Sequence, residues 1–324
     1  MCTAAVYRTK DYYFGRTLDH TRTYTEEVTV TPRRFPLTFG DAGRLDTHYA
    51  CIGMAYVADG YPLYYDAVNE KGLGMAGLHF VGQAVYRPVQ SGMDNIPPYA
   101  LIPWVLGQCA SVSEACALLA RTNLIDRPFR PDLPTAELHW MLSDGRESIV
   151  VEPGKDGLKI YPNPVEVLTN NPPFPQQCTQ LNNYMHLSPR PPENRFAEAI
   201  PLRTYSNGMG AIGLPGDLSS PSRFVRAAFM RANSVSGQEE GESVGQFFHI
   251  LGTVEQPCGC CLTESGELMM TRYTSCCNAV RGIYYYTTYE NRQISAVDMY
   301  REDLDGSAPV RYPIIRKEQI FAQN

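Results

Sequence analysis

Runs of alternating apolar and polar residues, typical of β-strands, recur along this chain in blocks that helical segments separate. The runs of the first block are residues 2–8, 12–18, 26–32, 51–57, 63–68 and 73–80. Later blocks are residues 138–142, 148–151, 159–161 and 165–169, and a last group within 268–299. Antiparallel strands in such number need helices to cover their apolar faces. The order therefore predicts an α+β fold, a four-layer α/β/β/α sandwich with two antiparallel sheets between helical layers, as one domain over residues 1–324.

Helical segments lie between these blocks. The first begins near residues 97–99, and Ser111 with Glu114 predicts a capping box in which Glu114 reaches back to the cap. A later helix is predicted to have Ser220 as its cap and Pro221 as its first residue, which places Arg223 in its first turn. Another helix covers residues 242–251, and the proline-rich segment 172–222 is expected to be mostly loop.

Composition excludes several classes of protein. Hydrophobic residues make up 44% of the chain and charged residues 19%, which is typical of a soluble globular protein. A net charge of −6 argues against nucleic-acid binding. No apolar run is long enough to span a membrane, and residues 1–19 lack the charged-then-apolar pattern of a leader. We therefore expect a cytoplasmic protein.

The ten cysteines raise the question of a metal site. Residues 258–261 and the pair Cys276–Cys277 are rich in cysteine, but no C-x-x-C pair stands on both sides of a suitable gap. Adjacent cysteines in a strand point to opposite faces, so one of each pair is expected in the core. The glycine-rich segment 208–217 lacks the lysine and the spacing of a phosphate-binding loop. We expect no metal and no cofactor.

Cys2 follows the initiator methionine and becomes the N-terminal residue once Met1 is removed, because its side chain is small. It then carries a thiol nucleophile and a free α-amine that can take a proton. Arg16 could favour the thiolate and Asp19 could orient the ammonium. The residues alone also allow a plain ion pair between Arg16 and Asp19 on a strand.

Six motifs in order resemble the choloylglycine hydrolase family of N-terminal-nucleophile amidases, which includes bile salt hydrolases and penicillin V acylases. They are Met1–Thr3, Phe14–Asp19, Val68–Leu73, Leu168–Pro172, Gly213–Asp217 and Ser219–Phe224. The bile salt hydrolases are the branch of the family whose sequences are more similar at three places: around Arg223, at residues 246–251 and at residues 275–278. The resemblance covers nearly the whole chain. It implies hydrolysis of glycine- or taurine-conjugated bile acids, no cofactor, and a homotetramer.

The resemblance also assigns roles. Cys2 matches the nucleophile, with its own α-amine as proton acceptor, Arg16 the arginine near the thiol, and Asp19 the aspartate that holds the amine. Asn170 matches the asparagine whose side chain completes the oxyanion hole, and Arg223 the arginine that supports the transition state.

Position 79 departs from the family pattern. The backbone N–H there is the second oxyanion donor implied by the resemblance, but bile salt hydrolases usually carry Asn and penicillin V acylases often Tyr, whereas this chain has His79. A backbone donor survives this change of side chain. A wide pocket of aromatic and aliphatic side chains is expected, with candidates in residues 20–25, 58–66, 79–84 and 129–139.

Other interpretations stay open from the residues alone. Asn170 could simply bond the turn before Pro172, and the remaining histidines have neither metal nor triad spacing. A penicillin V acylase or an N-acyl homoserine lactone acylase would use the same centre with a different pocket. A silent binding protein of the same fold would keep the pocket without amide turnover, and the complete set of catalytic matches argues against it.

Overall fold

The computed structural model describes residues 1–324 and contains two large antiparallel sheets. The first has six strands in the order β14-β1-β2-β15-β16-β17. Its strands are β1 (Cys2–Arg8), β2 (Tyr12–His20), β14 (Val167–Leu168), β15 (Met270–Asn278), β16 (Ile283–Thr288) and β17 (Ser295–Asp298). The N-terminal strand β1 therefore lies inside this sheet, paired on both edges.

The second sheet has eight strands in the order β13-β12-β11-β8-β7-β6-β3-β18. Its strands are β3 (Glu27–Thr31), β6 (Cys51–Ala58), β7 (Tyr61–Asn69), β8 (Gly74–His79), β11 (Leu138–Ser143), β12 (Ser148–Gly154), β13 (Gly157–Pro162) and β18 (Val310–Pro313). Two small ribbons complete the strands: β4 (Leu37–Thr38) with β5 (Arg44–Leu45), and β9 (Asp94–Ile96) with β10 (Thr122–Leu124).

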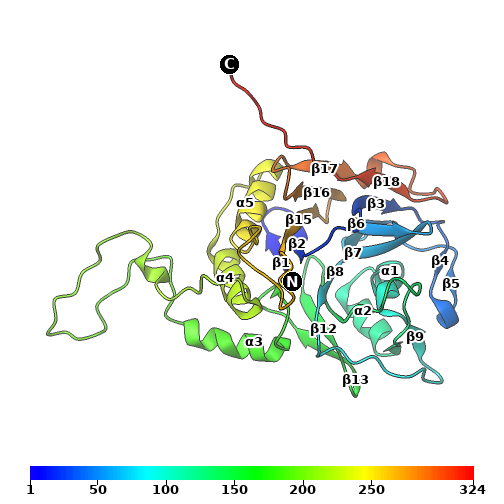
Figure 1. Cartoon of the computed structure of the whole chain (residues 1–324), viewed down its shortest axis with the longest axis horizontal. Coiled ribbons are helices and arrows are strands. Elements are labelled where there is room, and N and C mark those ends of the chain that lie inside the picture. Colours follow the sequence, from blue (N-terminus) through cyan, green and yellow to red (C-terminus); the bar gives the residue numbers. More distant parts are fainter.

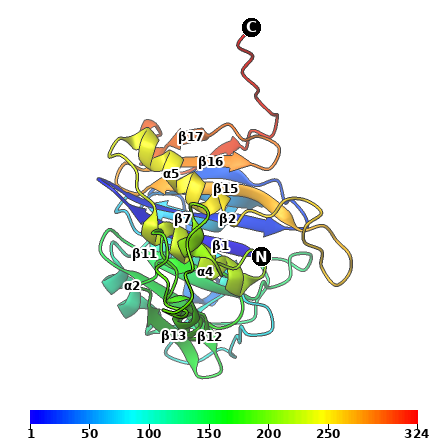
Figure 2. The same cartoon turned by 90° about the vertical axis from the view of Figure 1, so that its left-hand side faces the viewer.

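Helices cover the outer face of each sheet. The α-helices are α1 (Leu101–Leu106), α2 (Val112–Leu119), α3 (Phe174–Gln180), α4 (Ser220–Asn233) and α5 (Glu240–Gly252). Short 3-10 turns are η1 (Gly40–Ala42), η2 (Pro98–Ala100), η3 (Leu181–Tyr184), η4 (Met209–Ala211) and η5 (Met299–Arg301). Helices α4 and α5 pack on the six-stranded sheet and α1 packs on the eight-stranded one, so Figure 1 shows four layers side by side. Figure 2 views the α4 and α5 layer over its sheet. None of the helices is long and apolar enough to cross a membrane.

Strand periodicity explains the layering. Along β12, Val150 belongs to the core between the sheets, while Ile149 and Val151 belong to the core beneath α1 and α2. Strand β11 repeats the pattern with Met141 inward and Trp140 outward. Because successive side chains point to opposite faces, both faces of this sheet are buried. The predicted four-layer arrangement is confirmed.

The helix ends depart from the sequence prediction. The hydroxyl of Ser111 accepts from Glu114 N, so the prediction of Ser111 as the cap is confirmed. The Glu114 carboxylate accepts from Ala110 N rather than from Ser111 N, so the reciprocal bond of the capping box is wrong. Helix α4 has Ser219 as its cap, and Ser220 is already helical. The Ser220 hydroxyl cannot cap the helix because it is bonded to the neighbouring loop.

Helix α3 lies in the segment that was expected to be loop. The prolines of this segment predict that no helix forms, but Pro173 is the N-cap of α3 and Pro175 lies in its first turn. A helix needs no N–H from those positions.

The cysteine pairs also depart from expectation. Cys276 and Cys277 are both buried, because α5 covers one face of β15 and the second sheet covers the other. Cys260 is exposed and Cys261 half-buried in an irregular segment, so neither belongs to the core. No group of three or more His, Cys, Asp or Glu side chains is arranged to hold a metal ion.

Between α3 and α4 the chain forms an arm, residues 185–212, that extends away from the layers (Figure 1). Large apolar side chains are exposed along it: Met185, Phe196, Ile200, Leu202, Tyr205 and Ile212.

Candidate active site

Cys2 is the first residue of β1 and is only 1% exposed. It pairs with Leu18 of β2. Two hydrogen bonds join the adjacent residues, Met1 and Asp19. Asp19 N donates to Met1 O at 2.8 Å, and the Met1 ammonium donates to Asp19 O at 2.6 Å. Strand register therefore puts Asp19 opposite Met1 and one residue away from the partner of Cys2.

Asn170 reaches Cys2 from the other edge of β1. Strand β14 pairs with β1 so that Leu168 is opposite Ala4, and continuing this register brings Asn170 level with Cys2. Cys2 N donates to Asn170 Oδ1 at 2.8 Å, and Asn170 Nδ2 donates to His79 O at 2.8 Å. The Asn170 side chain thus bridges the N-terminal strand and the end of β8.

Arg223 binds the same atoms from the first turn of α4. Its guanidinium donates to Cys2 O at 2.6 Å, to Thr3 Oγ1 at 2.6 Å and to Asn170 Oδ1 at 2.8 Å. Nη1 also lies 3.9 Å from Asp19 Oδ2. Burial lowers the pKa of Arg223, and the charges of Asp19 and Cys2 act in the opposite direction. These acceptors offset the unfavourable position of a cation at a helix N-terminus.

Arg16 lies on β2, one strand away from Cys2, and is buried. Its Nη1 donates to Tyr65 O at 3.0 Å and also to Gly77 O, while Nη2 has no partner. Burial acts to lower the pKa of Arg16, but the charges of Cys2, Tyr273, Asp66 and Asp19 raise it overall. The Arg16 guanidinium and the Cys2 thiol line the same cavity.

His79 is the last residue of β8. Phe80 N donates to Glu137 O at 2.8 Å, and Leu138 N donates to the Tyr86 hydroxyl at 2.9 Å. The His79–Leu138 pair is therefore a non-hydrogen-bonded pair, and the His79 N–H and C=O point away from β11. Since Asn170 binds that C=O, the His79 N–H faces the same side of β8 as Asn170.

The imidazole of His79 is neutral near pH 7. Burial lowers the pKa of His79 to about 3, and the N-terminal ammonium, His20, Arg16 and His139 act in the same direction. The ring packs 5.7 Å from the ring of His20.

The carboxylate of Asp19 is held from β15. Thr271 Oγ1 donates to Asp19 Oδ1 at 2.7 Å, and Oδ2 has no hydrogen-bond partner. With Met1 in place, no hydrogen bond joins this carboxylate to Cys2 N, whose partner is Asn170.

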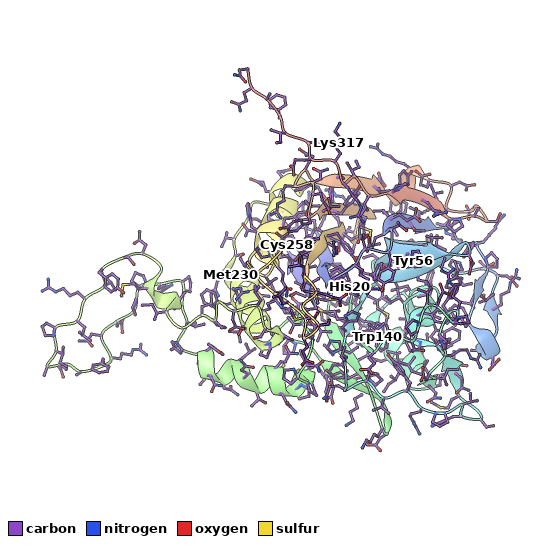
Figure 3. All side chains as sticks on the ribbon, in the orientation of Figure 1. His20, Tyr56, Trp140, Met230, Cys258 and Lys317 are labelled. Atoms are coloured by element: carbon purple, nitrogen blue, oxygen red, sulfur yellow. The ribbon has the colours of Figure 1, made fainter.

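A cavity of about 330 Å³ opens at Cys2 and Arg16. Its remaining walls are mostly apolar: Leu18, His20, Tyr24, Tyr56, Leu63, Tyr64, Tyr65, Gly77, His79, Tyr99, Phe129, Leu133, Pro134, Thr135, Ala136 and Leu138. His20 and Tyr56, both labelled in Figure 3, come from β2 and β6. Such a volume and lining suit a bulky apolar group with its reacting end at Cys2.

The chain matches the model of the linear amide C–N hydrolases, choloylglycine hydrolase family, over residues 2–312. It belongs to this family. A bile salt hydrolase/transferase from Lactiplantibacillus plantarum is 51% identical over 324 residues, covering 100% of both chains. Another bile salt hydrolase/transferase, from Clostridium perfringens, is 39% identical over 95% of both chains. The chain is therefore an amidohydrolase that acts on linear amides.

Solved structures agree with this membership. The C2A mutant of a conjugated bile acid hydrolase from Clostridium perfringens superposes with a TM-score of 0.92, at 37% identity and covering 100% of both chains. A penicillin V acylase from Agrobacterium tumefaciens has a TM-score of 0.75 at 22% identity, covering 96% of this chain and 90% of that one. The second match shows the shared fold alone.

The structure of this family member brings all six predicted site residues to one place. Cys2, Asn170, His79 and Arg223 are joined by hydrogen bonds, Asp19 lies against Arg223, and Arg16 shares the cavity with Cys2.

Sequence reasoning also found part of the cavity wall and missed part. Three predicted ranges, 20–25, 58–66 and 129–139, supply much of it, whereas His79 is the single contribution of 79–84. Tyr56 and Tyr99 were missed because nothing in their local sequence separates a cavity wall from ordinary strand or turn packing.

Proposed function

We propose that this protein hydrolyses the amide bond of bile acids conjugated to glycine or taurine, with Cys2 as the nucleophile after Met1 is removed. The observation that carries the proposal is the buried cluster around Cys2 at the mouth of an apolar cavity. The names of the relatives above, which are bile salt and conjugated bile acid hydrolases, support the choice of substrate.

In the first step, the Cys2 sulfur attacks the amide carbonyl carbon and its proton passes to the Cys2 α-amine. The carbonyl oxygen becomes an oxyanion, and its donors are the Asn170 side-chain amide and the His79 backbone N–H. Asn170 Nδ2 uses one proton on His79 O, which leaves its second proton for the oxyanion. Arg16 favours the thiolate, and Arg223 holds Asn170 Oδ1 and Cys2 O so that both partners keep their orientation.

In the second step, the carbon–nitrogen bond breaks and the leaving amine of glycine or taurine takes the proton from the Cys2 ammonium. A thioester between Cys2 and the bile acid remains. Water then attacks this thioester and gives one proton to the Cys2 α-amine. The carbon–sulfur bond breaks, the departing Cys2 thiolate takes that proton from the ammonium, and the free bile acid leaves.

Removal of Met1 is required by this chemistry, because an acylated nitrogen at Cys2 cannot act as a base. Loss of Met1 would also free the backbone N–H and C=O of Asp19, which now bind Met1. The Asp19 carboxylate would then hold the new ammonium, which is the role that the family resemblance implies. An active preparation should have an intact mass lower than the full chain by one methionine.

The cavity supports a steroid as the acyl group. Its aromatic walls are large and apolar: Phe129 packs edge-on against Tyr99 at 5.3 Å, and Tyr24 lies tilted against Tyr56 at 6.1 Å. Flat apolar rings fit such surfaces better than flexible polar groups.

The test is to incubate the protein with taurocholate, glycocholate and penicillin V side by side and to measure the released amine. Both bile acid conjugates should be cleaved with a higher kcat/KM than penicillin V. A preference for penicillin V would favour the alternative, an acylase with the same centre, and turnover of none of the three would count against the proposal.

Self-association, a reducing compartment and folding as one unit belong to the same proposal. Six large apolar side chains exposed along the arm, residues 185–212, support self-association, because they would leave water on packing against a second copy. The number of four copies follows from the family resemblance. Light scattering should give four chains per particle, and Phe196→Ser with Tyr205→Ser should reduce that number.

All ten cysteines are free, which supports a reducing compartment, the cytoplasm, as the place where the enzyme works. One cooperative unfolding transition is expected for residues 1–324.

A further inference from the structure

The side chain of Asn170 binds Cys2, His79 and Arg223. Asn170 itself lies two residues past the end of β14, so strand pairing does not hold its backbone. Its backbone lies at the start of a loop, at the point where the chain turns away from the sheet. A side-chain donor is useful in catalysis only if its own position is fixed before the reaction begins. Other contacts must therefore fix the Asn170 backbone.

Four consecutive hydrogen bonds form a ring through this loop. Asn170 N donates to Ser220 Oγ at 2.8 Å, and Ser220 Oγ donates to Thr169 Oγ1 at 3.0 Å. Thr169 Oγ1 donates to Gln177 Oε1 at 2.7 Å. Gln177 Nε2 closes the ring by donating to Asn170 O at 2.5 Å. The Ser220 hydroxyl accepts from Asn170 N and donates to Thr169 Oγ1. The Thr169 hydroxyl accepts that bond and directs its own proton to Gln177 Oε1, with Ser220 O as a second, longer acceptor at 3.1 Å.

Gln177 is the member of the ring that no other group can replace. It lies on α3 and is fully buried, and its Nε2 also donates to Pro172 O at 2.8 Å. A glutamine amide offers an acceptor on one atom and two donors on the other. All three contacts are used here, by Thr169, Asn170 and Pro172. Loss of any one of these partners would leave a buried polar atom without a hydrogen bond, which lowers the free energy of unfolding.

We propose that Gln177 is a positioning residue for the reaction, which fixes the backbone of Asn170 through this ring so that the Asn170 side chain meets Cys2 and His79. Ser220 ties the same ring to the first turn of α4, three residues before Arg223. The two groups that reach Cys2 from outside the strands, Asn170 and Arg223, are thereby held to one another. The inference rests on the proposed function, because it concerns how the oxyanion donor is held.

The test compares Gln177→Met with Gln176→Met. Both positions are on α3, but Gln176 is exposed whereas Gln177 is buried, so the second variant is a matched control for the helix. Kinetics are measured on taurocholate, and rates are expressed per active site after Cys2 alkylation is counted by peptide mass. Ser220→Ala opens the same ring from the α4 side and serves as an independent second variant.

For Gln177→Met we expect kcat per active site to fall by about 10- to 100-fold, because small displacements of a catalytic group cost that much. KM should change by less than about threefold, since the cavity walls are untouched. Ser220→Ala should also lower kcat, by a smaller factor. Gln176→Met should have the kcat and KM of the wild type.

Two results would overturn the inference: wild-type kcat per active site in Gln177→Met, or a loss confined to the number of active sites, which would make the residue merely structural. Both leave bile acid hydrolysis by the wild type intact, so they are distinct from failure of the proposed function, which is inactivity of the wild type itself.

Discussion

The centre around Cys2 and the cavity beside it are built in different ways. In the centre, Cys2, Arg16, Asp19 and Arg223 are almost fully buried, and strand register or several hydrogen bonds fix each of them. In the cavity, Tyr24 is 38% exposed, and the wall from Phe129 to Ala136 has no regular strand or helix. The centre is fixed by the pairing of the strands, whereas part of the wall, Tyr24 and residues 129–136, lies in irregular segments whose sequence can vary. Changes in the centre should therefore act on kcat, and changes in the wall on KM and substrate choice.

The largest effect is expected for Cys2→Ser. A hydroxyl is far less acidic than a thiol, so kcat should fall by at least about 10³-fold. Circular dichroism and intact mass should show that the variant is folded and lacks Met1. Substantial turnover by a folded, processed Cys2→Ser enzyme would mean that the nucleophile is another residue.

Asn170→Ala tests the centre next. It removes the side-chain donor and also the acceptor of Cys2 N and Arg223, so kcat should fall by about 10²–10³-fold. KM for taurocholate should change much less. A change confined to KM would place Asn170 among the binding residues and would break the contrast between centre and wall.

Phe129→Ala tests the wall. Phe129 packs on Tyr99 and Tyr61 at 5.3 and 5.8 Å between ring centroids, and its loss removes apolar surface from the cavity. We expect KM for taurocholate to rise by about 10-fold, from the loss of roughly 1–2 kcal/mol of apolar contact. kcat should stay within about threefold of the wild type. A large drop in kcat with unchanged KM would show that the wall also positions the reacting carbonyl.

His79→Asn tests the residue where the two regions meet, because its backbone belongs to the centre and its ring to the cavity. If the backbone N–H is the working donor, kcat should change by less than about tenfold, or 1.4 kcal/mol. Larger changes should appear in KM or in the ratio of bile salt to penicillin V hydrolysis. A loss of kcat equal to that of Asn170→Ala would mean that the imidazole takes part in the chemistry.

The smallest effect concerns stability against pH. The pKa of His79 is lowered to about 3 in the fold, chiefly by burial, whereas an unfolded histidine has a pKa of about 6.5. Below about pH 6.5 the unfolded chain binds a proton that the folded chain does not, so stability falls as the pH drops toward 3. His79→Asn should make that fall shallower in urea unfolding at pH 7 and pH 5. Identical slopes for the two proteins would show that His79 is protonated in the fold at pH 5.

The candidate site was largely predictable from the sequence, because its motifs are local. Cys2, Arg16 and Asp19 lie on the first two strands, whose pairing follows from a tight turn, and Arg223 was correctly placed in a first helical turn. The shift of the cap from Ser220 to Ser219 was not predictable, because the Ser220 hydroxyl is recruited by Asn170, which is fifty residues away in the chain.

What the sequence determined by itself is the set of buried faces and the chemistry that the chain carries. Period-two alternation marks which residues of a strand share a face, and Cys2 directly after Met1 predicts a nucleophile whose base is its own amine. Only the tertiary structure decided which strands are neighbours: β14 pairs with β1 across more than 160 residues, and that pairing brings Asn170 to Cys2. It also decided that α3 forms among prolines and that Gln177 is buried against Asn170. The physical reason is that alternation marks the face of a strand but not its partner, and a buried polar group reveals its role only through the distant atoms it binds.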